Sequence, residues 1–209
     1  MKTLLLITTL VVTTSFAQHS IPFASQNNTI ELSVANAATV DAGNVTVEVQ
    51  NAPQWLTFTN LKTQISNLKS REASTSSFTF SVDKSAPINK PHTLKFTISS
   101  PAGEKWTKEI AIQVSAPEKF ELFQNYPNPF NPSTTISFQI PVEAKVKVTI
   151  FNTLGQEIVT LFDGIRSAGY HQELWNARGV ASGMYIYQAA TELSNGKKEI
   201  VRKTMLLVK

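Results

Sequence analysis

The stretch that decides how the chain is organised reads Asn-Tyr-Pro-Asn-Pro-Phe-Asn-Pro, at residues 125–132. Prolines fix the backbone torsion φ, remove backbone hydrogen-bond donors and push each preceding residue toward an extended conformation, so no helix or central strand can pass through this stretch. The stretch predicts a stiff joint between two domains, with its aromatic side chains buried against a neighbouring domain. The residues of this joint are Tyr126, Pro127, Pro129, Phe130 and Pro132.

Apolar and polar residues alternate throughout the chain before the joint. Such alternation predicts β-strands with one buried face, and no stretch shows a sustained helical period. Seven short strands are predicted, at residues 30–34, 45–49, 55–58, 64–68, 78–82, 94–98 and 110–114. Short strands separated by turns are typical of a two-sheet antiparallel sandwich. Residues 18–117 are therefore predicted to form one immunoglobulin-like β-sandwich, and their pattern resembles that of bacterial immunoglobulin-like modules.

The chain after the joint repeats this pattern. Strands are predicted over residues 136–140, 146–150, 156–161, 170–175, 184–189 and 197–208. Turns are predicted at Leu154-Gly155, Asp163-Gly164 and Asn195-Gly196, because glycine and asparagine adopt positive φ readily. Residues 118–209 are therefore predicted to form a second sandwich that opens with the joint. The predicted fold class is all-β, with two immunoglobulin-like antiparallel sandwiches in tandem.

Residues 1–17 have the pattern of a secretory signal peptide. A positive charge at Lys2 precedes an apolar run, and small residues at Ser15 and Ala17 mark a cleavage site. The apolar run is shorter than the roughly 20 residues that a membrane-spanning helix needs. Cleavage after Ala17 would leave Gln18 as the mature N-terminus. We therefore expect export through the inner membrane, to the extracellular space or the outer-membrane surface.

The composition excludes several classes of site. The chain has 209 residues and no cysteine, which rules out disulfides, thiolate zinc sites, thiol nucleophiles and a lipid anchor on an N-terminal cysteine. The net charge of +4 is modest, and its excess lies near the C-terminus. We interpret that basic cluster as a polar strand edge or a partner contact, and expect no nucleic-acid binding. The cluster comprises Lys197, Lys198, Arg202, Lys203 and Lys209.

No catalytic or metal-binding constellation stands out, so no enzyme and no cofactor is predicted. Glycoside hydrolysis needs two converging carboxylates, and the acidic residues of the first domain form no close pair. His171 and Glu173 lie near Ser167, but no nucleophile elbow accompanies them. These residues are expected to be structural or solvated.

Two tryptophans in the first domain are open to two interpretations. An exposed tryptophan can stack on a sugar ring, which makes Trp55 and Trp106 the candidate glycan contacts. Tryptophans within apolar runs more often belong to the core or its rim, and this interpretation is favoured for both. The first domain is thus expected to be a structural or interaction module, with carbohydrate binding as the alternative.

Four motifs follow one another in the C-terminal part, at residues 123–136, 148–158, 182–185 and 203–209. Their order, spacing and terminal position resemble the C-terminal sorting domain of type IX secretion cargo, type A. The opening motif alone is also similar to the immunoglobulin-like domain of flagellar hook-capping proteins. The signal peptide argues against that alternative, because hook-capping subunits normally leave the cell by another route.

The resemblance to a sorting domain implies a function in export. It implies a sandwich that folds in the periplasm of a Gram-negative cell and is read by the outer-membrane translocon. A sortase then commonly removes the domain and can couple the cargo to surface lipopolysaccharide; we expect that cut within residues 115–120. The positions tied to secretion in the family correspond here to Gly183, Tyr185, Lys203 and Lys209.

Overall fold

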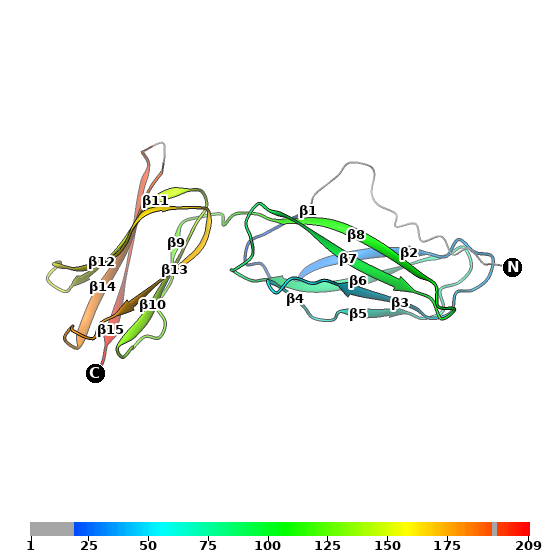
Figure 1. Cartoon of the computed structure of the whole chain (residues 1–209), viewed down its shortest axis with the longest axis horizontal. Helices are drawn as coiled ribbons and strands as arrows, with labels where there is room; N and C mark the ends of the chain where they lie inside the picture. Colours follow the sequence, from blue (N-terminus) through cyan, green and yellow to red (C-terminus); the bar gives the residue numbers. More distant parts are fainter. Residues whose placement is uncertain (1–18, 194–195) are drawn as a thin grey trace. The chain divides into compact units, whose positions relative to one another are not determined.

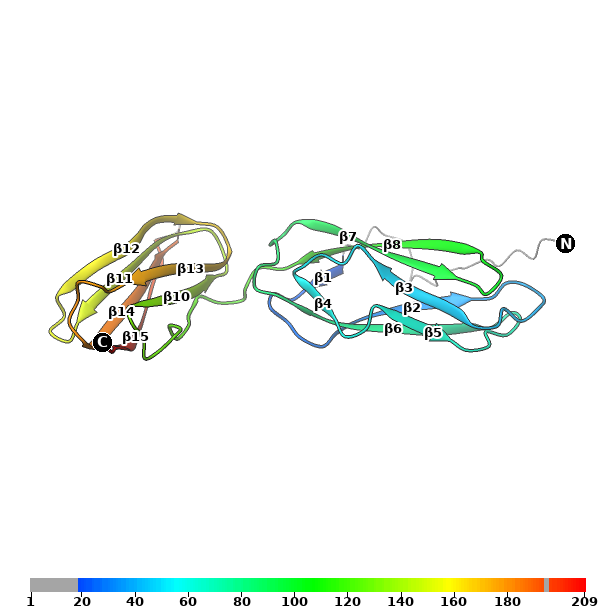
Figure 2. The same cartoon turned by 60° about the horizontal axis from the view of Figure 1, so that its bottom comes forward.

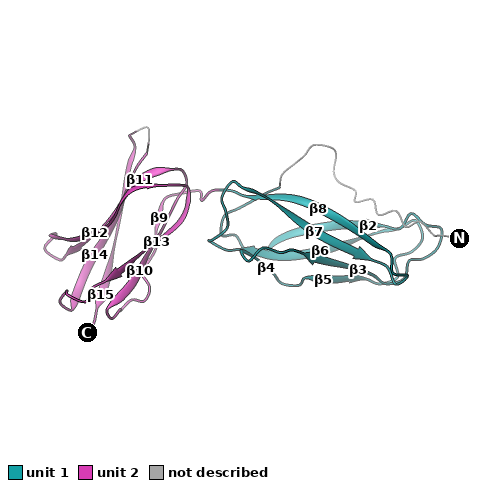
Figure 3. Ribbon diagram, viewed as in Figure 1, with its two compact units in different colours: residues 1–115 teal, residues 116–209 magenta. Residues whose placement is uncertain are grey.

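The structure is a computed structural model that describes residues 19–193 and 196–209. The predicted signal peptide therefore lies outside the described residues. The chain forms two compact units, Met1–Ser115 and Ala116–Lys209 (Figure 3). The division predicted between Pro117 and Glu118 lies close to this one. Every regular element in the described residues is a β-strand, and none of their segments is a helix that could cross a membrane.

The first unit is a sandwich of two sheets (Figure 1). One sheet has the strand order β1-β8-β7-β3-β5, and the other has the order β2-β6-β4. The strands are β1 (His19–Ile21), β2 (Asn28–Ala35), β3 (Val45–Gln50), β4 (Leu56–Phe58), β5 (Lys62–Ile65), β6 (Ala73–Val82), β7 (Pro91–Ser99) and β8 (Lys105–Val114). The alternating apolar residues point inward, and Val47, Phe78 and Phe96 are completely buried.

The first strand of this unit, β1, has no counterpart among the predicted strands. β1 has three residues and pairs in parallel with the end of β8, where His19 lies opposite Ile112. All the other pairings of named strands in the unit are antiparallel. A segment this short cannot show an alternating pattern, so its strand conformation depends on the neighbour that it pairs with.

The second unit is also a sandwich of two sheets (Figure 2). One has the order β13-β10-β9 and the other the order β12-β11-β14-β15. The strands are β9 (Glu121–Leu122), β10 (Ser133–Ile140), β11 (Ala144–Asn152), β12 (Glu157–Arg166), β13 (Gly169–Asn176), β14 (Gly183–Glu192) and β15 (Lys198–Leu207). Residues such as Ile136, Val148 and Tyr187 are completely buried between the sheets. The predicted all-β class, with a sandwich in each unit, is confirmed.

One predicted turn in this unit is wrong. The pair Asp163-Gly164 lies inside β12, where Asp163 pairs with Lys147 of β11. The Asp-Gly signal is local, whereas the pairing with β11 acts along the whole strand and overrides it. The other two turns join strands: Gly155 has a φ of 79° and Gly196 has a φ of 80°. Asn195 lies outside the described residues.

Candidate functional site

Residues 123–132 form a loop between β9 and β10, and we call this segment the proline loop. It is not the connector between domains that the sequence predicted. β9 precedes the loop and β10 follows it, and these two strands pair with each other. The chain therefore leaves the sheet and returns to it within the second unit. The peptide bonds before Pro127, Pro129 and Pro132 are cis. The joint prediction treated the prolines as a local stiff rod, whereas contacts with distant strands shape this segment.

The burial of the two aromatic residues also differs from the prediction. Tyr126 was expected to be buried against a neighbouring domain, but it is 81% exposed. Phe130 is 2% exposed, and it is buried within the core of its own unit. Its ring packs against Trp175, with 5.4 Å between the ring centroids. Phe130 therefore closes the core of the sandwich where the loop crosses it.

Hydrogen bonds tie the start of the proline loop to β10. The backbone groups of Tyr126 and Thr135 bond to each other in both directions, at 3.0 and 2.9 Å. The hydroxyl of Thr134 donates to the carbonyl oxygen of Pro127 at 2.8 Å. The side-chain amide of Asn125 donates to that carbonyl at 3.0 Å and to the Thr134 hydroxyl at 2.9 Å. The first half of the loop is thus fixed to the smaller sheet.

The buried hydroxyl of Tyr187 connects the loop to the larger sheet. It donates to the carbonyl oxygen of Phe123 at 2.9 Å and accepts the backbone N–H of Asn125 at 2.9 Å. Tyr187 is completely buried on β14, and this burial raises the pKa of its hydroxyl to about 12, although the bond from Asn125 acts in the opposite direction. The neutral phenol is therefore the form that fits the folded unit.

The end of the loop pairs with the C-terminal strand. Phe130 lies opposite Leu207 in a parallel bridge, with its N–H donating to the carbonyl oxygen of Leu206 at 3.0 Å. The N–H of Val208 donates to the carbonyl oxygen of Phe130, also at 3.0 Å. The side chain of Asn128 accepts the N–H of Leu206 at 3.0 Å. The loop therefore acts as a short extra strand along the end of β15.

These contacts divide the outer edge of β15, the edge that faces away from β14. Gln124 donates its side-chain amide to the carbonyl oxygen of Thr204 at 2.9 Å. Together with Asn128 and Phe130, it closes the edge from Thr204 to Val208. This covered half is the part of the terminal strand that Phe130 and Asn128 hold in place.

The first half of the same edge is open. Backbone groups in a strand point to alternate sides, so residues in register with Leu206, such as Arg202 and Ile200, direct their N–H and C=O groups outward. Within the described residues, no strand pairs with β15 on this side. Ile200 is also 56% exposed. The segment from Lys198 to Arg202 is therefore an unpaired strand edge.

The four predicted sorting residues lie close to this strand pair. Gly183, which has a φ of 150°, lies opposite Leu207, and Tyr185 lies opposite Met205. Tyr185 is 7% exposed and donates its hydroxyl to the carbonyl oxygen of Ala181 at 2.7 Å. Gly183 and Tyr185 therefore shape the start of β14.

The two predicted lysines are more accessible than Tyr185. Lys203 lies in β15 opposite Tyr187, and Lys209 lies just beyond the strand. The ammonium group of Lys209 donates to the carbonyl oxygen of Arg178 at 3.1 Å. Structure and sequence thus place these basic groups at the terminal strand, and their role in recognition stays a prediction.

Other members of the basic cluster are engaged at the surface. Lys198 forms an ion pair with Glu192 at 3.3 Å. The Nε of Arg202 donates to the side-chain oxygen of Gln188 at 2.7 Å. Exposed pairs of this kind contribute little to stability. Glu192 balances the charge of Lys198, whereas Arg202 bonds to a neutral amide and keeps its positive charge beside the open edge.

The tryptophans of the first unit are only partly exposed, and both pack against its core. Trp55 contacts the ring of His92 edge-on at 5.4 Å. His92 pairs with Ile112 of β8, whereas Trp106 is six residues earlier in that strand. At about 3.3 Å per residue, the two indoles are separated by roughly 20 Å along the sheet and do not form a single platform. Glycan contact by either one stays a prediction.

His171 and Glu173 make structural contacts. The Nε2 of His171 lies 2.8 Å from the carbonyl oxygen of Ser167. Glu173 accepts a hydrogen bond from Arg166 at 2.6 Å in a partly buried ion pair. Within the described residues, no group of three or more His, Cys, Asp or Glu side chains could hold a metal ion.

Residues 124–205 match the family model of the secretion system C-terminal sorting domain. The second unit is a sorting domain of this family. The matched span begins within the proline loop and ends in β15, so it includes the contact between Gln124 and Thr204 and stops one residue before Leu206. It implies that the chain is type IX secretion cargo, exported to the cell surface or the extracellular space, and that it interacts with the type IX machinery. The hook-capping domain, the alternative resemblance, is not the family that this model describes.

Comparison with solved structures shows distant similarity only. The CupB2 chaperone of Pseudomonas aeruginosa is 11% identical, with a TM-score of 0.29, over 89% of this chain and 96% of that one. Dimeric latent PorU of Porphyromonas gingivalis is 12% identical, with a TM-score of 0.37, over 97% of this chain and 20% of that one. These similarities are too low to bear on function. No curated protein matches the chain.

Proposed function

We propose that the protein is a non-catalytic cargo of the type IX system whose sorting domain is read at the terminal strand. The observation that carries this proposal is the open outer edge of β15 beside the basic cluster, within the span that matches the sorting family. An unpaired edge can take a strand from a partner, because main-chain hydrogen bonds supply affinity and the flanking side chains supply specificity. The proposed partner is the outer-membrane translocon.

The covered half of the edge sharpens this mechanism. A partner strand cannot pair along the whole outer edge of β15, because the proline loop already occupies the part from Thr204 to Val208. Pairing with the translocon would therefore use the part from Lys198 to Arg202. The proline loop would serve to hold the rest of the strand in place for that pairing.

Deletion of residues 203–209 would test export but not recognition. Met205 and Leu207 are 2% and 1% exposed in the core, so their removal would also disrupt the fold. A cleaner test is Ile200→Pro, which removes an outward N–H and leaves the pairing with β14 intact, since proline is tolerated on strand edges. The matched control Ile200→Ala shortens the same side chain and keeps the N–H.

We expect export to fail for Ile200→Pro and to continue for Ile200→Ala, in a bacterium with type IX secretion. The measurement is the fraction of the protein in the culture medium and on the cell surface, by immunoblot, with thermal unfolding of each purified variant as a check on folding. Normal export of a folded Ile200→Pro variant would show that backbone pairing at this edge is not the signal.

We further propose that a sortase removes the sorting domain within residues 115–120, after which surface lipopolysaccharide could be attached. This segment lies between β8 and β9 and contains no strand, and Glu118 and Lys119 within it are exposed. Exposed segments outside regular structure are the preferred sites of cleavage. Mass spectrometry of the secreted protein would locate the new C-terminus, and a C-terminus after Pro132 would contradict the proposal.

For the first unit we propose a structural or interaction role. Both tryptophans pack against the core, which supports this role over glycan binding. A glycan array with the mature protein tests the alternative. Binding that is lost in Trp106→Ala or Trp55→Ala would support a carbohydrate-binding module instead.

A further inference from the structure

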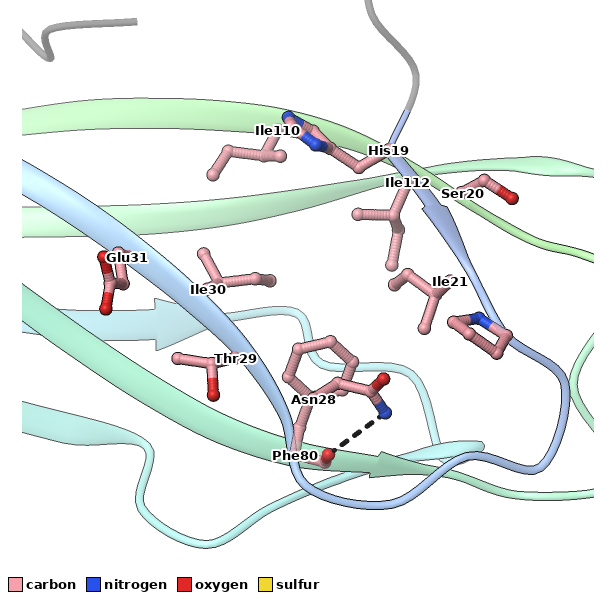
Figure 4. A pocket seen from close by; sticks show the side chains of 11 residues that line it. His19, Ser20, Ile21, Asn28, Thr29, Ile30, Glu31, Phe80, Ile110 and Ile112 are labelled. Carbon is pink, nitrogen blue, oxygen red and sulfur yellow. Dashed lines mark hydrogen bonds between the residues drawn. The ribbon is translucent and has the colours of Figure 1, made fainter. Parts of the chain in front are cut away.

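The first unit has an opening between its two sheets. A cavity of about 290 Å³ lies between the edges of the two sheets (Figure 4). Ile30 of β2 and Ile110 of β8 line it from opposite sides, and both are only partly buried. Phe80, Ile112 and Ile21 form its apolar floor, at 2%, 0% and 6% exposure. The cavity between the two strand edges thus has an apolar floor, and His19, Asn28 and Glu31 add polar groups to its lining.

Both flanking strands are at the edges of their sheets. β2 pairs only with β6, so its other side has no strand partner in the described residues. β8 pairs with β1 only from Ile112 to Val114. On the same side, Lys105–Ala111 has no strand partner within the described residues. The N–H of Ser115 points toward β1 and donates to Ile21. In the same alternation, Ala111 directs its N–H outward.

β1 is an example of the kind of segment that pairs with this edge of β8. Its extended backbone pairs with β8, and one of its side chains, Ile21, enters the core. Within the described residues, β1 begins at His19, and β8 continues past that point along the cavity without a strand on the same side.

We propose that this opening binds an extended strand of a partner protein, with apolar side chains at alternate positions. The incoming strand would pair with β8 at Thr107–Ala111 and place one apolar side chain between Ile30 and Ile110. A cavity of about 150 Å³ holds a benzene ring, so the space here is sufficient for an aromatic or branched aliphatic side chain. This proposal rests on the interaction role of the first unit and does not depend on export.

A second copy of this chain fits the opening poorly. The residues of β2 that face away from its own core are Thr29, Glu31 and Ser33, and on β8 they include Thr107 and Glu109. A copy that offered either edge strand would bring polar side chains into the apolar cavity, with an unfavourable desolvation energy. The apolar side chains of these two strands already face the core of their own unit and cannot enter the cavity of another copy. A partner segment must therefore supply the apolar side chains.

The test uses the mature chain, residues 18–209, and a phage library of ten-residue segments. In one library Val, Ile, Leu or Phe alternates with Ser, Thr or Lys, and in the control library the same residues are shuffled so that apolar residues are adjacent. We expect enrichment from the alternating library only. On binding, amide hydrogen exchange at Thr107, Glu109 and Ala111 should become slower, because these outward-facing amides gain acceptors.

Two variant pairs locate the binding. Ala111→Pro removes the outward N–H, whereas Ala111→Ser keeps it; Ile110→Gln makes the cavity wall polar, whereas Leu61→Gln changes a side chain that is 51% exposed elsewhere in the unit. We expect the first variant of each pair to weaken binding about tenfold, which corresponds to about 1.4 kcal/mol. The controls should bind as the parent does. Thermal unfolding confirms that each variant is folded, and the backbone pair remains informative if Ile110→Gln is not.

Several results would overturn the proposal. These are equal enrichment from both libraries, protection from exchange on another strand, unchanged binding by Ala111→Pro, and self-association of the mature chain through this edge. None of them alters the export experiment, which depends on the sorting domain. Failure here and failure of the proposed export function are therefore separate observations.

Discussion

The buried hydroxyl of Tyr187 is the contact whose removal has the best-defined consequence. Tyr187→Phe leaves the ring in place, so no large cavity forms, but the Phe123 carbonyl and the Asn125 N–H each lose a partner at 2.9 Å. Asn125 is 2% exposed, so water cannot readily replace the lost acceptor. An unsatisfied buried donor costs about 1–3 kcal/mol, and the lost bond to the partly exposed Phe123 about 1 kcal/mol more.

We therefore expect the free energy of unfolding of the sorting domain to fall by about 2–4 kcal/mol. Urea unfolding of the mature protein measures this through Trp175, which is 4% exposed in that domain. The background variant Trp55→Phe/Trp106→Phe leaves Trp175 as the single reporter among the 3 tryptophans. With a slope of about 1 kcal/mol per molar urea, the midpoint should move by about 2 M or more.

Tyr185→Phe provides the matched control. It removes the same chemical group from the same strand, but that hydroxyl makes one bond, to the Ala181 carbonyl. The expected loss is about 1 kcal/mol, because Ala181 is exposed and water can replace the hydroxyl. If Tyr187→Phe destabilised the domain no more than Tyr185→Phe, the argument that Tyr187 anchors the proline loop would be refuted.

Three further predictions concern the same domain. Gly183→Ala should destabilise it by about 1–2 kcal/mol, because a φ of 150° is strained for alanine. The thermal unfolding midpoint measures this loss. The control Gly179→Ala should change the midpoint little, because Gly179 has no positive φ and the added methyl group meets open space. Asn128→Ala removes the acceptor of the Leu206 N–H and should make exchange of that amide roughly fivefold faster by NMR, since the bond contributes about 1 kcal/mol. Tyr187 has a pKa of about 12 in the folded domain and about 10 in the unfolded chain, so the unfolded chain releases this proton first. The stability from this group is fully present below pH 10 and falls by up to about 2 kcal/mol between pH 10 and 12. Urea unfolding at each pH should show this decrease in the parent and a weaker one in Tyr187→Phe.

The strands of both sandwiches could be predicted from the sequence because their information is local. Alternation at residues such as Ile136 and Phe138 reports directly which face of a strand is buried, and both are completely buried. β1 could not be predicted, because its strand conformation depends on β8, far away in the sequence. Pairing of two distant segments leaves no periodic signal in either one.

The candidate site was predicted only in part for the same reason. The sequence predicts the proline motif as a stiff joint and as the opening of the sorting domain, but it does not predict the contacts of the motif. Its actual contacts join residues such as Phe123 and Tyr187, 64 positions apart, and Asn128 and Leu206, 78 positions apart. Tyr187 alternates with Tyr185 as a core residue of a strand would, and this pattern does not indicate that its hydroxyl binds the loop. The repeated Asn residues of the motif were the available signal, since asparagine side chains commonly bond to backbone groups in turns.

Burial separates the predicted sorting residues into two kinds. Tyr185 is 7% exposed and its ring packs against Trp175, so a translocon that reads the folded domain cannot contact much of it. If Tyr185 acts in export as proposed, it acts by positioning β14 and hence β15. Lys209 is exposed just beyond the terminal strand and can be contacted directly, whereas Lys203 is partly buried opposite Tyr187. A folded but export-deficient variant is therefore expected at Lys209 or at Ile200, whereas an export defect at Tyr185 should come with a measurable loss of stability.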